Sequence, residues 1–427
     1  MDVSRRSFLG LLASLFSAAC GSGAGSERAA EKAASAKETP AATPPASTPV
    51  ATPKPPGPVK LSYLTGSSVK IEQIIGEYDR QTKKPTLNLT ESRFGVIGTD
   101  LGYSFEHAGQ LYFLFGDAMI RGGTDPMGFT TATDPNAPMA MQILSDKAGT
   151  FIPIRAPGIS MNAFEVPTAG ISVDGIAYVS VITNYTAEKD VYKALLMRFD
   201  ERAKSFAAVR ELSHLPGGHF IKLALHASPP ELSGLPEAGP HVLMFGCDEY
   251  RKSNPYLAVV PNASFAGGQG TRYFVGLSNG EPRWSDKESA CVPVFNHPTI
   301  GDMSVAFVQQ LGLWLMLYDS REPRGILLRY ATKPWGPWSE PVIVFESARD
   351  KARGVFIHDP SLVLDDGLGG PVAGDADPLA VAGASYGPYM IERFTRVADD
   401  KLTIHYLLSL WNPYTVVRMK STLTISR

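Results

Sequence analysis

Two aspartates, Asp100 and Asp117, are the residues whose spacing most clearly suggests chemistry in this chain of 427 residues. The dipeptide Ala108-Gly109 lies midway between them and is typical of a two-residue hairpin loop. With that loop, His107 pairs with Gln110, and the register places Asp100 opposite Asp117. Because adjacent strands lie about 4.8 Å apart, we expect the two carboxylates to repel each other and to titrate as a coupled pair.

A coupled carboxylate pair of this kind supplies an acid and a base, as glycoside hydrolysis requires. One carboxyl protonates the leaving oxygen while the other activates water or attacks the sugar. A separation of about 5 Å predicts retention of configuration and about 6.5–9.5 Å predicts inversion, and the sequence does not choose between them. The alternative is that both aspartates simply end strands, since aspartate favours turns.

Asp302 and Asp319 repeat the 17-residue spacing of the first pair. The repeated spacing is either a structural feature of the repeat itself or the sign of a second carboxylate pair that faces the same cleft. Other side chains reach this face if the repeats superpose, and they include the aromatic residues Tyr103, Tyr250 and Tyr389. The predicted substrate-binding residues are Glu165, Asp248, Asp302, Tyr386, Trp411 and Asn412.

Several other patterns do not support a different chemistry. The segment Gly383–Gly387 fits G-x-S-x-G, but a nucleophile elbow needs a following helix, and Pro388 with a strand-like segment follows here. The eight histidines form no H-E-x-x-H motif and no Cys/His cluster, so we expect no metal site and no cofactor. The acidic loop 365–377 suggests Ca²⁺ binding, although a solvated loop is the simpler interpretation.

The elements that must position these residues are short strands. Hydrophobic residues make up 44% of the chain and charged residues only 19%, with 40 glycines and 34 prolines, which argues against a helical bundle. The net charge of −2 provides no basic excess for nucleic-acid binding. Segments rich in β-branched or aromatic residues predict the strands 111–115, 176–182, 241–245, 313–318, 390–394 and 402–408. The best short helix candidate is 71–78.

Internal repetition organises these strands. The plan of residues 99–117 returns 202 residues later at 301–319, and further copies run from Val166, end at Asp248 and start near Gly383. Five units over the segment 59–427 give roughly 74 residues each, which suits a four-stranded blade. The sequence therefore predicts an all-β fold, a five-bladed β-propeller over 59–427, with a two-sheet sandwich as the alternative. The strand-like segment 59–63 would close the ring by joining the last blade.

The first 58 residues predict export and a tether. Twin arginines at Arg5-Arg6, followed by Phe8-Leu9 and an apolar run, are typical of a Tat signal over residues 1–20. Small residues before Cys20 resemble a lipobox, although Ser17 stands where Leu is usual, so we expect Cys20 to be lipidated; an ordinary signal peptide is the alternative. Residues 21–58, with eight prolines between 40 and 58, predict a disordered linker. The expected location is the periplasm or cell surface, anchored to the membrane by the lipid.

The remaining cysteines, Cys247 and Cys291, are too few for a disulfide scaffold. They either pair in an oxidising compartment or remain buried thiols, and Tat cargo folds before export, which favours thiols.

A set of motifs spread over 59–427 resembles a bacterial and phage family of endo-D-arabinanases, formerly a domain of unknown function. The motifs are Gly98-Thr99-Asp100-Leu101-Gly102, Leu114-Phe115-Gly116-Asp117, Asn254-Pro255-Tyr256-Leu257-Ala258, Pro334-Trp335-Gly336-Pro337-Trp338-Ser339, Tyr386-Gly387-Pro388-Tyr389 and Trp411-Asn412-Pro413-Tyr414.

The resemblance implies a five-bladed propeller and places the catalytic carboxylates at Asp100 as base and Asp117 as acid, roles that can be exchanged. It implies an arabinan substrate. The two-carboxylate mechanism requires no metal, and we expect a monomer. The chain departs from the family at Asp302, where Glu is usual, and in its leader. We therefore expect a secreted glycoside hydrolase that is endo-acting on D-arabinan. The alternatives are a non-catalytic carbohydrate-binding propeller and a propeller hydrolase for another furanoside.

Overall fold

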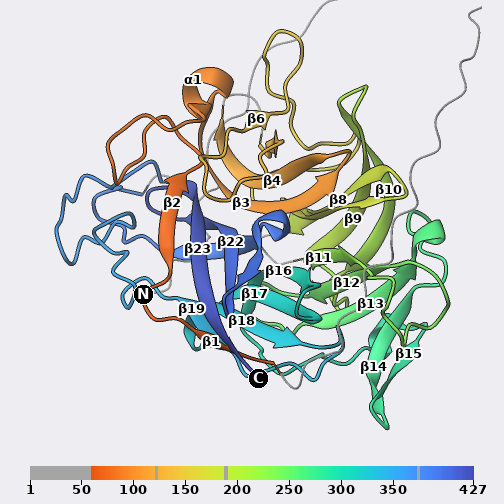
Figure 1. Ribbon diagram of the computed structural model, residues 1–427. Coiled ribbons are helices and arrows are strands. Elements are labelled where there is room, and N and C mark those ends of the chain that lie inside the picture. Colours follow the sequence, from red (N-terminus) through yellow and green to blue (C-terminus); the bar gives the residue numbers. More distant parts are fainter. Residues whose placement is uncertain (1–58, 121–123, 187–190, 373–375) are drawn as a thin grey trace, which may run out of the picture. The chain divides into compact units, whose positions relative to one another are not determined.

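The computed structural model describes residues 59–427 except 121–123, 187–190 and 373–375. The predicted signal peptide 1–20, the linker 21–58 and Cys20 lie outside the described residues and stay predictions. The described residues form five β-sheets arranged around one axis (Figure 1). The predicted five-bladed propeller is therefore confirmed, and the sandwich alternative is excluded.

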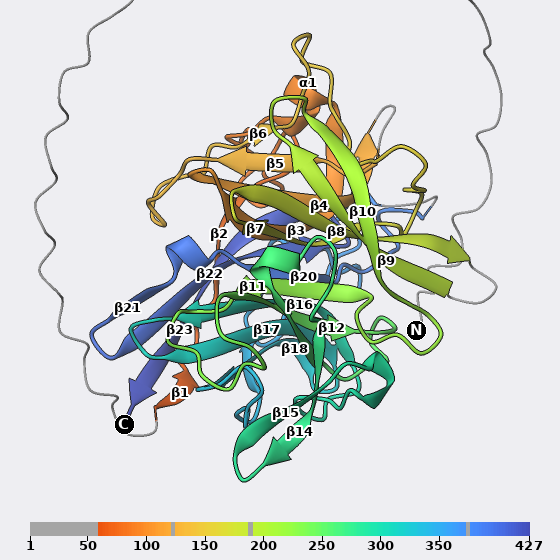
Figure 2. The ribbon, with the colours of Figure 1, turned by 90° about the vertical axis from the view of Figure 1, so that its right-hand side faces the viewer.

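Each sheet is one blade, numbered here in chain order. Blade 1 contains β3 (Val96–His107), β4 (Gln110–Ile120), β5 (Met127–Thr130) and β6 (Gln142–Ile143). Blade 2 contains β7 (Pro167–Val173), β8 (Ile176–Thr186), β9 (Val191–Asp200) and β10 (Ser205–His214). Blade 3 contains β11 (Lys222–Ala227), β12 (His241–Cys247), β13 (Tyr256–Pro261), β14 (Arg272–Ser278) and β15 (Glu281–Ser285). The β14–β15 hairpin projects at the edge of the molecule in both views (Figure 1 and Figure 2).

Blade 4 contains β16 (Ile300–Val308), β17 (Leu313–Arg321), β18 (Arg324–Ala331) and β19 (Val342–Phe345). Blade 5 contains β20 (Ser385–Met390), β21 (Arg396–Ala398), β22 (Lys401–Leu410) and β23 (Thr415–Ser426), together with β1 (Lys60–Tyr63) and β2 (Val69–Gln73). The helices are short: α1 (Thr90–Phe94) and the 3₁₀ turns Asn262–Ser264, Glu288–Ala290 and Glu392–Phe394. In the part of the chain that the structure describes, no helix is long and apolar enough to cross a membrane.

The ring closes between the two ends of the described chain. β1 pairs antiparallel with β23, with Lys60 opposite Ser426, so the strand predicted at 59–63 does join the last blade. This pairing satisfies the backbone of an edge that would otherwise be exposed. All five sheets are formed by strands that lie within residues 60–426.

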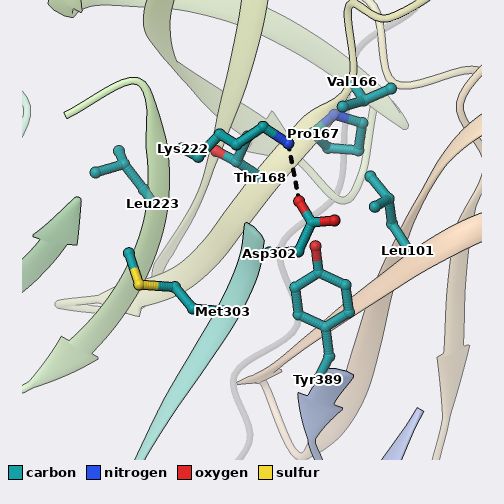
Figure 3. A pocket seen from close by; sticks show the side chains of 9 residues that line it. All are labelled: Leu101, Val166, Pro167, Thr168, Lys222, Leu223, Asp302, Met303 and Tyr389. Carbon is teal, nitrogen blue, oxygen red and sulfur yellow. Dashed lines mark hydrogen bonds and ion pairs between the residues drawn. The ribbon is translucent and has the colours of Figure 1, made fainter. Parts of the chain in front are cut away.

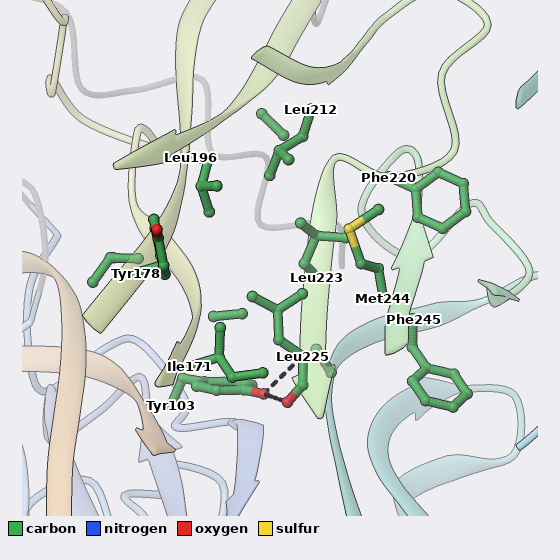
Figure 4. Close-up of a cluster of buried hydrophobic side chains, with 14 of the residues drawn as sticks. Tyr103, Ile171, Tyr178, Leu196, Leu212, Phe220, Leu223, Leu225, Met244 and Phe245 are labelled. Carbon is green, nitrogen blue, oxygen red and sulfur yellow. Dashed lines mark hydrogen bonds between the residues drawn. The ribbon is translucent and has the colours of Figure 1, made fainter. Parts of the chain in front are cut away.

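The innermost strands of the blades are β3, β7, β11, β16 and β20, and each contacts its neighbours around the axis. Apolar side chains from adjacent blades fill the space between the sheets (Figure 4). Tyr103 ties two inner strands together there: its hydroxyl donates to Leu225 O at 2.9 Å and accepts from Leu225 N at 2.8 Å. The five inner strands thus form a rigid frame whose ends present side chains to the axis.

The predicted register of the first hairpin is correct only near its turn. His107 pairs with Gln110, and the pairing continues without a shift to Tyr103. A bulge then follows, because Leu101 and Gly102 adopt positive φ angles of 62° and 116°. Asp100 consequently lies opposite Gly116, and the prediction that it faces Asp117 directly is wrong by one residue.

Two smaller predictions are also wrong. The segment 390–394 is not a continuous strand, since β20 ends at Met390 and Glu392–Phe394 forms a 3₁₀ turn. The segment 71–78 is not helical, because β2 occupies its first half and pairs with β23. In both places a strand partner or a tight turn overrides the local sequence preference.

Candidate active site

One end of the propeller axis collects the chemically competent side chains. Asp100, Lys222, Asp302 and Tyr386 all lie near the N-terminal ends of their inner strands. The second strand of a blade runs antiparallel to the first, so its C-terminal part returns to the same end and brings Asp117 with it. The fold therefore brings together residues that are far apart in the sequence.

Asp100 is buried, and its carboxylate accepts a hydrogen bond from the inner strand of blade 5. Tyr386 Oη donates to Asp100 Oδ2 at 2.8 Å. A hydrogen bond donated to a carboxylate stabilises its ionised form. Gly116 opposite Asp100 has no side chain, and a Cβ there would lie 2.7 Å from Leu101 and 2.8 Å from Val166. Glycine is thus required for the two strands and blade 2 to pack closely at this point.

Asp117 is held in an unusual backbone conformation by three contacts. Its φ of 45° lies in the left-handed region, which is uncommon for residues other than glycine. Its amide donates to Asp125 Oδ1 at 3.0 Å, and its carbonyl accepts from Tyr414 Oη at 2.9 Å. Its carboxylate Oδ1 accepts from Phe164 N at 2.8 Å. These contacts come from three parts of the chain and fix the direction of the carboxylate.

Asp125 is a third carboxyl group at this site, and the sequence reasoning missed it. It is fully buried, and its Oδ2 accepts from Thr124 Oγ1 at 2.8 Å. Burial, followed by repulsion from Asp117 and then a weaker repulsion from Asp100, raises the pKa of Asp125 well above its usual range. Asp125 therefore holds a proton more tightly than an exposed aspartate, directly beside Asp117.

The second aspartate pair has a different environment. Lys222 Nζ donates to Asp302 Oδ1 at 2.8 Å, and the Arg251 guanidinium lies 2.7 Å from Asp319 Oδ2. Asp319 Oδ1 also accepts from Asp302 N at 2.8 Å. Tyr250 lies between the two cations, with its ring centre 4.2 Å from Lys222 Nζ and 4.7 Å from Arg251 Cζ. Both cations were missed by the sequence reasoning, since neither is part of a motif.

The Lys222–Asp302 ion pair borders a narrow cavity on the axis (Figure 3). The cavity has a volume of about 10 Å³, roughly enough for one water molecule. Burial, together with the charges of Asp302 and Asp100, raises the pKa of the Tyr389 phenol beside it well above its usual range. A neutral Tyr389 therefore remains a hydrogen-bond donor at any physiological pH.

The sequence matches one family model. The description of that family is "Domain of unknown function (DUF4185)", and the match spans residues 86–420. The chain belongs to this family. None of the curated proteins matches the chain.

Solved structures similar to the DUF4185 domain include several propeller enzymes. They include a putative exo-beta-1,3-galactanase from Bifidobacterium bifidum (9% identity, covering 83% of this chain and 94% of that one, TM-score 0.41). A GH43_1 enzyme from Xanthomonas citri complexed with xylotriose has 12% identity, coverage of 77% and 89%, and a TM-score of 0.40. A Coprinopsis cinerea GH62 alpha-L-arabinofuranosidase has 12% identity, coverage of 84% and 98%, and a TM-score of 0.40. At these scores the similarity says nothing about the activity of this chain.

Glu165 and Asp248 also lie at this end of the DUF4185 domain. Glu165 accepts from Ser160 Oγ at 2.5 Å and from Asn162 N at 2.7 Å, so it shapes the loop that carries Phe164 N to Asp117. Burial alone would raise the pKa of Asp248, but hydrogen bonds, the first from His219, lower it overall. The substrate-binding role of both residues stays a prediction.

Trp411 and Asn412 lie in the turn between β22 and β23 of the DUF4185 domain. The Asn412 side chain is fully buried and bonds three backbone groups, Pro378 O at 2.8 Å, Val381 O at 2.7 Å and Gly370 N at 2.8 Å. This arrangement favours loop positioning over direct contact with a ligand. Trp411 packs edge-to-face on Tyr414 with ring centres 5.9 Å apart, and Tyr414 is the residue whose hydroxyl donates to Asp117 O.

Neither a metal site nor a disulfide is formed by the described residues of the DUF4185 domain. Among them, no three His, Cys, Asp or Glu side chains are grouped so as to hold an ion. Cys247 and Cys291 are free and buried, and burial raises the pKa of each thiol to about 12. Such thiols are inert packing residues.

Proposed function

We propose that the domain is a glycoside hydrolase that cleaves arabinofuranosyl linkages, most specifically an endo-acting hydrolase of D-arabinan. The observation that carries this proposal is the placement of Asp100 and Asp117 on paired strands, with the buried carboxyl of Asp125 beside Asp117. Three acidic groups so close together cannot all ionise readily, which provides one proton donor and one acceptor.

The contacts support different roles for the two residues. Tyr386 donates to Asp100 and thereby stabilises its carboxylate form, so Asp100 acts as the base that activates water. With Asp100 as the base, Asp117 acts as the acid that protonates the leaving glycosidic oxygen, and the buried carboxyl of Asp125 holds its backbone amide. Phe164 N donates a hydrogen bond to the Asp117 carboxyl. The left-handed backbone of Asp117 places the carboxyl for this contact, which holds it in position during the step.

The substrate assignment rests on the resemblance of the motifs around Asp100, Asp117 and Trp411 to endo-D-arabinanases. This chain has Asp302 where the family usually has Glu. Asp302 forms an ion pair with Lys222 on the axis. A shorter side chain at this position leaves more room beside the ion pair, which is a reason to test several furanose polymers.

The proposal is tested by incubating residues 59–427 with purified mycobacterial arabinogalactan and resolving the products by size. We expect a ladder of short arabino-oligosaccharides. Release from L-arabinan or fructan alone would contradict the D-arabinan assignment but retain a hydrolase. Binding of glycan by the folded protein without release from any polymer would favour the carbohydrate-binding alternative.

A further inference from the structure

A second cavity lies beside blade 5, on the segment that connects β2 with α1. It has a volume of about 390 Å³, within the usual range for small-ligand pockets. Its walls come from the segment 73–92 on one side and from the β22–β23 turn on the other. Figure 1 shows β2 and β23 lying side by side here, and their pairing fixes the cavity to the propeller.

The lining of this cavity combines an aromatic and apolar wall with charged groups. Tyr78 is 56% exposed, and Pro413 and Tyr414 contribute the apolar surface opposite. Arg80 and Glu91 supply donors and acceptors. Within the described residues, the side chains of Tyr78, Arg80 and Glu91 form no hydrogen bond or ion pair, so their polar groups are available to a ligand.

One side chain, that of Tyr414, connects the cavity with Asp117 of the proposed catalytic pair. Tyr414 lines the cavity, and its hydroxyl donates to Asp117 O at 2.9 Å. Ile97 also lines it, three residues before Asp100 on β3. A side chain at Gly98 would collide with Tyr414 O, so β3 and the turn carrying Tyr414 pack directly together. Tyr414 is therefore shared between the wall of this cavity and the support of the Asp117 backbone.

We propose that this cavity is a subsite for a sugar residue of the same polymer, away from the bond that is cleaved. The inference rests on the proposed action on a polysaccharide. Aromatic and proline surfaces match the apolar C–H face of a sugar ring, while a guanidinium and a carboxylate bind neighbouring hydroxyl groups. Because Arg80 is balanced by Glu77 and Glu91, the lining does not suit a phosphate or another polyanion.

Binding to purified mycobacterial arabinogalactan tests the subsite without requiring turnover. The Asp117→Asn chain, comprising residues 59–427, serves as the parent, and Tyr78→Ala or Arg80→Met is added to it. Loss of a stacking or charged contact is expected to weaken polymer binding about 10-fold, while affinity for a di- or trisaccharide stays that of the parent. Arg202→Met, an exposed arginine in the β9–β10 turn, is the matched control and is expected to bind like the parent.

The outcomes separate this inference from the proposed function. Equal polymer affinity for the parent, Tyr78→Ala and Arg80→Met would overturn the subsite even if the wild type hydrolyses arabinan. Weakened polymer binding in these variants would support the subsite even if the wild type releases no product, in which case the proposed function fails alone.

Discussion

The two aspartate pairs of blades 1 and 4 share a 17-residue spacing but have opposite electrostatic environments. In blade 4, Lys222 and Arg251 each neutralise one carboxylate. In blade 1, the contacts described for Asp100 and Asp117 come from the hydroxyls of Tyr386 and Tyr414, a backbone amide and a third carboxyl, Asp125. The first arrangement stabilises two ionised carboxylates, whereas the second crowds acidic groups together.

This difference shows that spacing alone does not identify a catalytic pair. An ion pair lowers the cost of burying charge and holds neighbouring blades together, which is a structural function. A buried cluster of acids keeps a proton available at the site and is costly to stability, which is typical of functional sites. The proposed function therefore places the chemistry in blade 1, while the ion pairs of blade 4 support the axis.

The largest expected effect concerns the ion pair of blade 4. Lys222→Ala leaves the buried Asp302 carboxylate without its cation, and removal of one partner of a buried pair costs about 3–5 kcal/mol. Unfolding by urea measures the loss. The double variant Lys222→Met/Asp302→Leu removes both charges and is expected to recover most of the stability. A single variant as stable as the wild type would show that the pair has no structural role.

The next effect concerns the hydroxyl that Tyr386 donates to Asp100. Tyr386→Phe removes one hydrogen bond to a charged group, worth about 1.5–3 kcal/mol, which corresponds to roughly a 10- to 150-fold lower kcat/KM. Initial rates on arabinogalactan measure it. Tyr330→Phe, a half-buried tyrosine on the outer part of blade 4, is the control and is expected to retain the wild-type rate. Wild-type kcat/KM in Tyr386→Phe would remove Asp100 from the proposed role.

The smallest expected effect is a change in how stability depends on pH. The pKa of Asp125 in the folded protein is raised above the value of about 3.9 for an unfolded chain. The stability that protonated Asp125 contributes to the fold is therefore fully present below that pH. It is lost as the pH rises through the folded pKa. Asp125→Asn keeps the oxygen that accepts from Asp117 N but cannot ionise, so this loss of stability disappears.

Melting temperatures of the wild type and Asp125→Asn between pH 4 and 8 measure the effect. We expect the melting temperature of Asp125→Asn to rise relative to that of the wild type as the pH increases. Parallel curves over the whole range would contradict a raised pKa at Asp125 and leave the residue as a hydrogen-bond acceptor only.

Much of the fold follows from repetition along the sequence. The recurrence of strand, turn, strand and terminal acid predicted five units, and the strand-like segment at 59–63 predicted closure of the ring. These features depend on local patterns and on the need to pair edge strands, which the sequence records directly.

The parts of the site that were missed depend on geometry that no local pattern records. The bulge at Leu101-Gly102 shifts Asp100 by one residue, although glycine in a strand is itself a signal for a bulge. Asp125 precedes Pro126 and resembles an ordinary turn residue; only the folding of β5 against β4 buries it. Lys222 and Arg251 come from blade 3 and reach blade 4 only after the ring has formed.

The most direct test compares hydrolysis of arabinogalactan by the wild type, Asp100→Asn, Asp117→Asn and Asp174→Asn. Asp174 is an exposed turn residue with a left-handed backbone like that of Asp117, so it controls for the change of side chain in that conformation. Release of reducing ends is expected to fall about 10²- to 10⁴-fold in the two blade 1 variants and to stay unchanged in Asp174→Asn. Wild-type rates in folded Asp100→Asn or Asp117→Asn would contradict the assignment of acid–base chemistry to blade 1.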